Sequence, residues 1–403
     1  MAHWTAIVAD ISTMPKTFDL PLPDTDALSH SQGLLGLIQH EIDAGGGMIP
    51  FDRYMELALY APGLGYYSAG NQKFGAGGDF VTAPELSALF SRALAHQCAE
   101  ILSQIPGGEI LEFGAGSAAM AVDLLGELER LQSLPQRYGI LEISAELRAR
   151  QQRHLQDALP HLFERVYWLD HLPTAFRGVV LANEILDAMP VQRFCWQQGL
   201  LRELYVGRDS DGLRLIAEQP SPLLAARVGD LAGRYAWEGE YCSELNLRAE
   251  PWIASLGSML QEGVALLIDY GFPRHEYYHR QRDRGTLMCH YRHRAHDDAL
   301  LWPGLQDMTA HVDFTAVAEA AVQAGLAVRG YTSQANFLLG NGLLEMLAQS
   351  GAGDTRAQLA LSNQVKRLTM PGEMGEMFKV MALGKAWQGP LRGFALRDER
   401  ARL

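Results

Sequence analysis

The sequence contains few cysteines and none of the cysteine spacings that serve a metal or a redox pair. Its 403 residues include four, Cys98, Cys195, Cys242 and Cys289, and no two of them form a C-x-x-C. Zinc knuckles and dithiol redox motifs depend on such spacing. We therefore expect neither, and we expect four reduced thiols, as is usual in a reducing compartment.

Long apolar runs and an excess of positive charge are also missing. No run reaches the roughly 18 residues that a membrane span needs. Lys and Arg number 34 against 47 Asp and Glu, a net charge of -13, which argues against nucleic acid because its phosphates must be met by basic side chains. The acid-containing first thirty residues resemble neither a secretory signal nor a transit peptide. We expect a cytoplasmic protein without membrane insertion.

What is present is the composition of a globular chain, 48% hydrophobic and 20% charged. Apolar residues at helical spacing predict helices after residue 34 and after Pro50. From residue 107 onward, short apolar runs alternate with helical segments, at 110–113, 139–141, 179–182 and 264–268, with a further strand ending near Trp168. This alternation predicts an α/β fold with a mostly parallel sheet covered on both faces. A last edge strand is expected at 378–383.

Two segments are expected to be insertions in that fold. Between Gln192 and Ile216, two β-rich runs flank Gly207 and the Asp211-Gly212 turn, which predicts an antiparallel insertion. Residues 274–313 are rich in histidine and arginine, and they are too long for an ordinary connection. Thr82 and Glu85 have the spacing of a capping box at the start of a helix.

A strand that runs into a glycine turn and then a helix is the strongest local signal, at Gly114-Ala115-Gly116. Such a turn lets a nucleotide-like ligand approach the backbone at the switch point of an open sheet. One interpretation is a dinucleotide site, with Glu142 after the next strand binding a ribose. The other is a sulfonium cofactor such as S-adenosylmethionine, which the carboxylate of Glu112 would attract, whereas it would repel a pyrophosphate.

Three polar residues follow the strand at 179–182, namely Asn183, Glu184 and Asp187. The carboxyl end of this strand is expected beside the glycine turn, where ligands bind in doubly wound sheets. Polar groups there are costly to bury without partners. They either cap the following turn, or Asn183 contacts a cofactor while Glu184 holds a cationic acceptor.

Several motifs in a fixed order resemble the MidA family of S-adenosylmethionine-dependent methyltransferases, which includes a mitochondrial methyltransferase for complex I assembly that dimethylates an arginine. The resemblance covers residues 34–385. It is carried by APGLGYY (61–67), GDFVTAPE (78–85), EFGAG (112–116), NEILDAMPV (183–191), IDYG (268–271), GTL (285–287), DMTAHVDF (307–314) and PGEMGEMFKV (371–380).

The family resemblance implies a class I methyltransferase core, Rossmann-like, with an N-terminal helical layer and inserted β-hairpin and helical segments. We expect a surface arm at 1–31, the helical layer covering the cofactor site at 32–106, and a tail at 386–403. The core would span 107–385, with insertions near 192–250, 274–313 and 335–372. One departure from the family is Ala118, where many relatives keep a glycine, and it puts the strength of cofactor binding in question.

Site residues carried over by position fall into three groups. The cofactor-binding group is Glu112, Gly114, Gly116, Glu142, Asp170 and Asn183. The catalytic group is Glu184 and Asp187, which would orient the acceptor. The substrate or lid group is Asp79, Thr82, Glu85, His311 and Asp313.

No metal is expected, although Cys289, His290, His293 and His296 are types that bind zinc. Arg292 and Arg294 lie among them and would repel a cation, and the resemblance brings no metal. The segment is expected instead to form a basic patch in a lid that faces the acceptor.

The implied activity is transfer of a methyl group from S-adenosyl-L-methionine to a protein arginine, leaving S-adenosyl-L-homocysteine. A respiratory complex I subunit is the candidate partner by resemblance. The alternatives are a noncatalytic assembly factor that binds the cofactor, a small-molecule methyltransferase, and, least favoured, a nicotinamide dehydrogenase.

Overall fold

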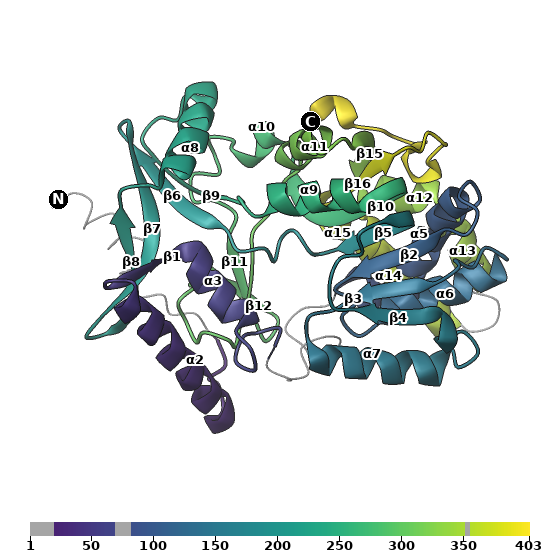
Figure 1. Cartoon of the computed structure of the whole chain (residues 1–403), viewed down its shortest axis with the longest axis horizontal. Coiled ribbons are helices and arrows are strands. Elements are labelled where there is room, and N and C mark those ends of the chain that lie inside the picture. The colour runs from purple at the N-terminus through teal and green to yellow at the C-terminus, as the bar shows by residue number, and fades with distance from the viewer. Residues whose placement is uncertain (1–19, 69–81, 351–354) are drawn as a thin grey trace.

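An eight-stranded sheet forms the centre of the larger lobe in the computed structural model, which describes residues 20–68, 82–350 and 355–403 (Figure 1). The strands lie in the order β15-β16-β10-β5-β2-β3-β4, and β14 pairs with β10. All neighbours from β4 to β10 are parallel, whereas β16 is antiparallel to β10 and to β15. The strands are β2 (Glu109–Phe113), β3 (Tyr138–Leu141), β4 (Val166–Leu169), β5 (Phe176–Asn183), β10 (Leu260–Phe272), β14 (Val312–Asp313), β15 (Ala327–Ser333) and β16 (Phe378–Lys385).

The order of these strands reverses at β2, which lies between β3 and β5. The chain runs outward from β2 through β3 to β4 and then crosses back to β5 on the other side of β2. In open α/β sheets, ligands bind beyond the carboxyl ends of the strands at such a switch point. The predicted α/β fold with a mostly parallel sheet is therefore confirmed, and its topology locates the site at the ends of β2 and β5.

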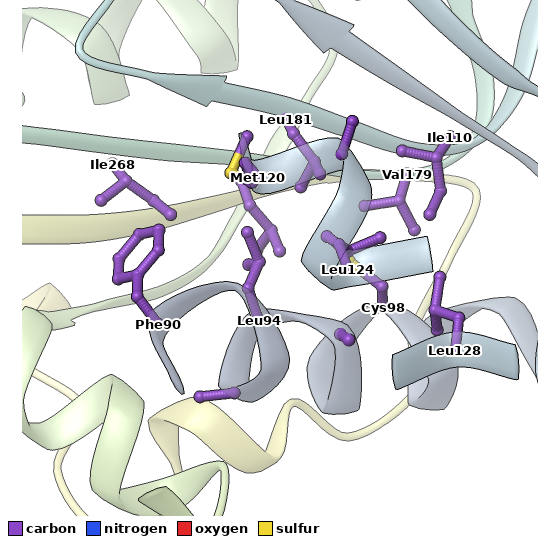
Figure 2. Close-up of a cluster of buried hydrophobic side chains, with 14 of the residues drawn as sticks. Phe90, Leu94, Cys98, Ile110, Met120, Leu124, Leu128, Val179, Leu181 and Ile268 are labelled. Carbon is purple, nitrogen blue, oxygen red and sulfur yellow. The ribbon is translucent and has the colours of Figure 1, made fainter. Parts of the chain in front are cut away.

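Both faces of the sheet are buried because successive residues of a strand point to opposite sides. Val179 and Leu181 of β5 pack on one side, with the helices α5, α6, α12, α13 and α14. Figure 2 shows part of this cluster, in which Phe90 and Leu94 lie beneath the strands. Val180 and Ala182 pack on the other side with α9 and α11. The helices are α5 (Ala88–Leu102), α6 (Ala119–Arg130), α9 (Ala249–Met259), α11 (Phe314–Gln323), α12 (Gln334–Gly340), α13 (Leu343–Ser350) and α14 (Thr355–Thr369).

A second lobe, on the left of Figure 1, combines the inserted strands with the first helices. A five-stranded sheet has the order β1-β7-β6-β9, with β8 paired to β7, and a three-stranded sheet has the order β12-β11-β13. Helices α2 and α3 bury Leu34, Ile38 and Phe51 against these strands. The elements are β1 (Met48–Pro50), β6 (Gln192–Gln197), β7 (Leu200–Asp209), β8 (Gly212–Glu218), β9 (Glu240–Leu245), β11 (Met288–Tyr291), β12 (Arg294–His296), β13 (Asp307–Thr309), α2 (Thr25–Ala44), α3 (Phe51–Tyr60) and α8 (Pro222–Tyr235).

The remaining elements are short, apart from α7. They are α4 (Ala83–Leu86), α7 (Ala145–Ala158), α10 (Arg274–Tyr277), α15 (Met374–Met377) and the 3-10 turns η1 (Phe163–Arg165), η2 (Arg392–Phe394) and η3 (Arg400–Arg402). Within the described ranges, no helix combines the length and the apolar character that crossing a membrane requires.

Several boundaries differ from those expected. Helix α2 begins at Thr25, because Asp24 caps it by accepting from the Ala27 amide at 2.9 Å, so residue 31 lies inside a helix. Helix α5 belongs to the core of the large sheet rather than to an N-terminal layer. The tail packs on the core through Phe394. Strand β15 was not expected, and it makes β16 an interior strand instead of the edge.

The expectation of four reduced thiols was wrong for one pair. Cys195 of β6 and Cys242 of β9 form a disulfide, because the antiparallel register places these two residues directly opposite each other. Cys98 and Cys289 are free and buried.

Candidate active site

The glycine turn after β2 has the backbone that its sequence requires. Gly114 and Gly116 have φ of 60° and 53°, values that are accessible to glycine without steric cost. A Cβ on Gly114 would lie 2.8 Å from Cδ1 of Ile185. Ala118 also has a positive φ, 68°, and occupies the N-cap position of α6 without a capping hydrogen bond from its side chain. The alanine therefore keeps the turn, in a conformation that costs a non-glycine residue roughly 1 kcal/mol.

A cavity of about 580 Å³ lies over this turn, and all but one of the expected cofactor residues line it. The expected catalytic residues line it as well, so the structure brings them together. The predicted residues along its wall are Thr82, Glu85, Glu112, Gly114, Gly116, Glu142, Asn183, Glu184 and Asp187.

Glu112 of β2 and Glu142, which follows β3, are carboxylates beside the turn. Glu112 is 1% exposed and accepts a hydrogen bond from the Tyr138 hydroxyl at 2.7 Å. Burial raises the pKa of Glu112 to about 7. Glu142 follows β3 and accepts from the Ser144 amide and from Nε2 of Gln151, each at 2.9 Å. Burial raises the pKa of Glu142 too, and these hydrogen bonds oppose the rise.

The loop after β5 is held in a strained conformation. Glu184 has a φ of 54°, a left-handed conformation that costs a non-glycine residue free energy and that recurs at functional sites. Its amide donates to the carbonyl of Ile268 at 2.9 Å, and Nδ2 of Asn183 donates to its Oε1 at 3.1 Å. Asp269 accepts from the Leu186 amide at 2.9 Å. The end of β10 thus fixes this loop, a role that the sequence analysis did not give to Asp269.

The carboxyl groups in this loop are buried together. Burial is the main reason that the pKa of Glu184 is raised to about 8, and the negative charge of the nearby Asp187 contributes to the rise. Burial also raises the pKa of Asp187, and it raises that of Asp269 well above its ordinary value. Within the described part of the chain, the buried Oδ1 of Asp187 has no hydrogen-bond partner, whereas the carboxyl as a whole interacts with the Tyr270 hydroxyl, which opposes the rise of the Asp187 pKa. An orphaned carboxylate oxygen in a cavity is costly unless a ligand donates to it.

The second lobe supplies part of the cavity wall through Tyr60, Tyr67, Asp307 and Glu56. Arg248, which precedes α9 of the core, lines the cavity as well. None of these residues was predicted from the sequence. The hydroxyl of Tyr67 donates to Oδ1 of Asp307 at 2.8 Å, and the rings of Tyr60 and Tyr67 stack at 5.5 Å. The only available signal was that Tyr67 and Asp307 belong to motifs of the family.

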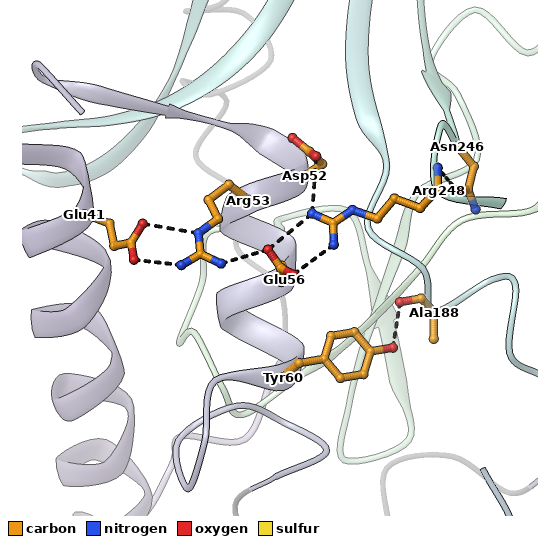
Figure 3. Close-up of polar contacts among 8 residues, drawn as sticks. All are labelled: Glu41, Asp52, Arg53, Glu56, Tyr60, Ala188, Asn246 and Arg248. Atoms are coloured by element: carbon orange, nitrogen blue, oxygen red, sulfur yellow. Dashed lines mark hydrogen bonds and ion pairs between the residues drawn. The ribbon is translucent and has the colours of Figure 1, made fainter. Parts of the chain in front are cut away.

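A chain of ion pairs joins the two lobes beside the cavity (Figure 3). Arg53 of α3 bridges Glu41 of α2, at 2.7 Å, and Glu56, at 2.8 Å. Arg248, which precedes α9, pairs with Glu56 at 2.9 Å and with Asp52 at 3.4 Å. One helical turn beyond Glu56, the Tyr60 hydroxyl donates at 2.9 Å to the carbonyl of Ala188, in the loop of Glu184.

The segment at 78–85 is only partly described. Asp79 lies outside the described residues. Thr82 lies at the N-cap of α4, but its side chain makes no capping hydrogen bond, so the expected capping box is not formed. Glu85 instead accepts from the hydroxyl of Ser117, next to the glycine turn.

Three predicted residues lie away from the cavity. Asp170 is exposed and pairs with Arg148 at 2.9 Å. His311 and Asp313 line a second cavity of about 200 Å³. Asp313 caps α11 and pairs with Arg274 at 2.9 Å.

The histidine-rich segment forms the β11–β12 hairpin, with His290 facing the main cavity. Among the residues that the structure describes, no three His, Cys, Asp or Glu side chains come together as a metal site would require.

A glycine turn at the switch point of a Rossmann-like sheet, beneath a cavity rich in acids, defines a protein that binds a nucleotide-like cofactor. Residues 93–332 match the family described as "Putative S-adenosyl-L-methionine-dependent methyltransferase". The chain belongs to this family, and the nicotinamide alternative is excluded.

Relatives of known structure and name agree with this assignment. A crystal structure of a protein from Burkholderia thailandensis bound to S-adenosyl-homocysteine is 46% identical, with a TM-score of 0.92 over 96% of this chain and 100% of that one. The protein arginine methyltransferase NDUFAF7, mitochondrial, of Danio rerio is 29% identical, covering 84% of this chain and 83% of its own length. The Drosophila melanogaster homolog is also 29% identical, with shares of 84% and 82%.

The expectation of a cytoplasmic location is contradicted by these curated relatives, which are named as mitochondrial proteins. The signal used for it, acidic residues among the first thirty, concerns a part of the chain that lies largely outside the described residues.

S-adenosyl-L-methionine is the cofactor of this methyltransferase, and the cavity fits it. The volume of about 580 Å³ lies within the roughly 300–1,000 Å³ of small-ligand sites, and Gly114 and Gly116 border the cavity without side chains. When bound, the cofactor supplies a methyl group on a positively charged sulfur.

Proposed function

We propose that this methyltransferase transfers methyl groups to an arginine side chain of a protein, with a respiratory complex I subunit as the candidate substrate. The observation that carries this proposal is the buried loop after β5, where Glu184 is held in a left-handed conformation beside the unpartnered Oδ1 of Asp187. The names of the curated relatives support arginine as the acceptor, and the family resemblance supports a complex I subunit.

An arginine acceptor makes two demands that these residues meet. The guanidinium is charged at any ordinary pH and is a weak nucleophile. We assign Glu184 the role of orienting the guanidinium and concentrating its positive charge away from the reacting nitrogen, and Asp187 a second hydrogen bond to it. A bond from the reacting nitrogen to the methyl carbon would form in line as the carbon–sulfur bond breaks, S-adenosyl-L-homocysteine would leave, and the nitrogen would give up its proton to the carboxylates of this loop. Positioning supplies most of the rate of such a step.

The cofactor-binding roles follow from position. Gly114 and Gly116 leave room for the ligand along the backbone, Glu142 accepts from ribose hydroxyls, and Asn183 faces the cofactor from β5. Glu112, beneath the turn, provides negative charge for a cationic ligand. Helices α2 and α3, with the inserted strands, form the lobe that faces the acceptor.

The test is incorporation of a labelled methyl group. The purified protein is incubated with methyl-labelled S-adenosyl-L-methionine and an extract of cells that lack this protein, and labelled bands are digested for mass spectrometry. Methyl-arginine in a discrete protein supports the proposal. Label confined to the low-mass fraction would indicate a small-molecule methyltransferase, and no label despite cofactor binding would indicate a noncatalytic assembly factor.

A further inference from the structure

The cavity holds more acidic side chains than the loop after β5 provides. Among the described residues that line it, seven are acidic, and the basic ones are Arg248 and His290. Arg248 is already paired with Glu56. The reaction brings two cations together, the sulfonium and the guanidinium, so an excess of carboxylates matches the charge of the complex. The acidic residues are Glu56, Glu85, Glu112, Glu142, Glu184, Asp187 and Asp307.

Two of these acids come from the other lobe, namely Asp307 and Glu56, and Glu56 forms ion pairs with Arg53 and Arg248. Asp307 begins β13, is 8% exposed, and borders the cavity. The Ala310 amide, just beyond β13, donates to the Asp187 carbonyl at 3.0 Å. This bond ties β13 to the loop of Glu184, so the carboxylate of Asp307 has a fixed position relative to the two acids of that loop.

Tyr67 orients the Asp307 side chain. Its hydroxyl donates to Oδ1 of Asp307 at 2.8 Å, and its ring is held by stacking on Tyr60. The hydroxyl of Tyr60 is in turn fixed on the Ala188 carbonyl. A carboxylate held in this way loses little conformational entropy when it binds a ligand.

A guanidinium has five N–H donors in a planar fork, more than one or two carboxylates satisfy. We propose that Asp307, oriented by Tyr67, is a further acceptor-binding residue, whose carboxylate accepts hydrogen bonds from the guanidinium that Glu184 and Asp187 hold from the β5 side. This inference rests on the proposed function. Under this proposal, residues from both lobes form the acceptor site.

Two variants separate the charge of Asp307 from its contact with Tyr67. Asp307→Asn keeps an oxygen for the Tyr67 hydroxyl and removes the charge, whereas Tyr67→Phe keeps the charge and removes the orienting bond. Asp157→Asn, an exposed position on α7, is the matched control. Initial rates are measured against the concentration of the acceptor protein found by labelling, and affinity for S-adenosyl-L-homocysteine is measured by calorimetry.

We expect Asp307→Asn to raise the KM for the acceptor at least about tenfold and Tyr67→Phe about threefold, as expected for hydrogen bonds to charged groups. Affinity for S-adenosyl-L-homocysteine should stay within about twofold of wild type in both variants and so reports that they are folded. An unchanged acceptor KM in Asp307→Asn overturns the inference alone. An equal effect of both variants overturns it also, because the contact rather than the charge would then matter. If the wild type methylates residues other than arginine, the proposed function fails and the inference with it.

Discussion

Glu184 has a left-handed backbone conformation in the candidate active site, and burial raises the pKa of its carboxyl group. Both its role and its protonation can be tested. We expect Glu184→Gln to bind S-adenosyl-L-homocysteine with an affinity within about twofold of wild type and to lose methyl transfer by at least about a hundredfold, since an amide cannot neutralise the guanidinium. Calorimetry and initial rates measure the two effects. Full activity in this variant would refute the assignment.

The pH profile gives Glu184 a second test. Its pKa is raised to about 8 in the ligand-free protein, so the carboxylate form that we assign to catalysis becomes populated only as the pH rises. The wild-type kcat/KM should therefore increase between about pH 7 and pH 9. The residual rate of Glu184→Gln should lack this rise.

Gly114 lies in the glycine turn, and a side chain there would disturb the turn that we expect to contact the cofactor. Gly114→Ala would place a methyl group 2.8 Å from Cδ1 of Ile185 at a φ of 60°. We expect affinity for S-adenosyl-L-homocysteine to fall at least about tenfold and stability by roughly 1–2 kcal/mol. Gly126→Ala in α6 is the control, because nothing lies within 4 Å of the added atom and alanine favours a helix by roughly 0.5–1 kcal/mol. Equal binding by the two variants would contradict the prediction.

At the scale of elements, the pairing of α3 with the residues before α9 holds the acceptor lobe on the core. Arg248→Gln removes the ion pairs to Glu56 and Asp52, which are partly exposed, so we expect stability to fall by only about 0.5–1 kcal/mol. Acceptor KM should rise about three- to tenfold, because α3 also carries Tyr60, while cofactor affinity stays within about twofold.

The control for Arg248→Gln is Arg227→Gln, which breaks a pair with Glu250 on α9 at 2.6 Å, away from the main cavity. Urea denaturation and acceptor kinetics compare the two. A similar change of acceptor KM in both variants would show that the pair beside the cavity has no special role.

The elements also show how far sequence reasoning extends. The strands β2, β3, β5 and β10 were predicted because each is a short apolar run buried on both faces. Strand β15 was missed, since Arg329 and Gly330 interrupt its apolar pattern. Strand β16, expected as an edge strand, is apolar along most of its length, which is typical of an interior strand.

The candidate site also contains some residues that the sequence could predict and others that it could not. The glycine turn and the loop of Glu184 are local motifs, so their residues could be named from sequence. The contact of Tyr67 with Asp307 joins residues separated by 240 positions, and no local pattern predicts such a pair. The predicted Asp170 and His311 do not line the main cavity: Asp170 follows the edge strand β4, two strands from β2, and His311 precedes β14.

At the scale of the whole molecule, the buried carboxyls make folding stability depend on pH. Glu112 and Glu184 have pKa values of about 7 and 8 when folded, and near 4.3 when unfolded. The pKa of Asp269 is raised well above its ordinary value. Above about pH 5 the folded chain therefore keeps protons that the unfolded chain has released, which lowers the free energy of unfolding as pH rises. Burial lowers the pKa of His290 and that of His311. These histidines therefore make the free energy of unfolding rise with pH, but only up to about pH 7, where histidines of the unfolded chain have become mostly neutral.

Raising the pH from about 7 to about 8 should therefore destabilise the ligand-free protein. Each proton retained only by the folded state lowers the free energy of unfolding by about 1.4 kcal/mol per pH unit, so we expect a fall of at least about 1 kcal/mol. Urea titrations followed by tryptophan fluorescence at the two pH values measure it. Glu184→Gln removes one of the titrating groups and should flatten the dependence, whereas Asp157→Asn, exposed on α7, should not. Stability that stays constant or rises over this interval would mean that these carboxyls are ionised in the folded protein.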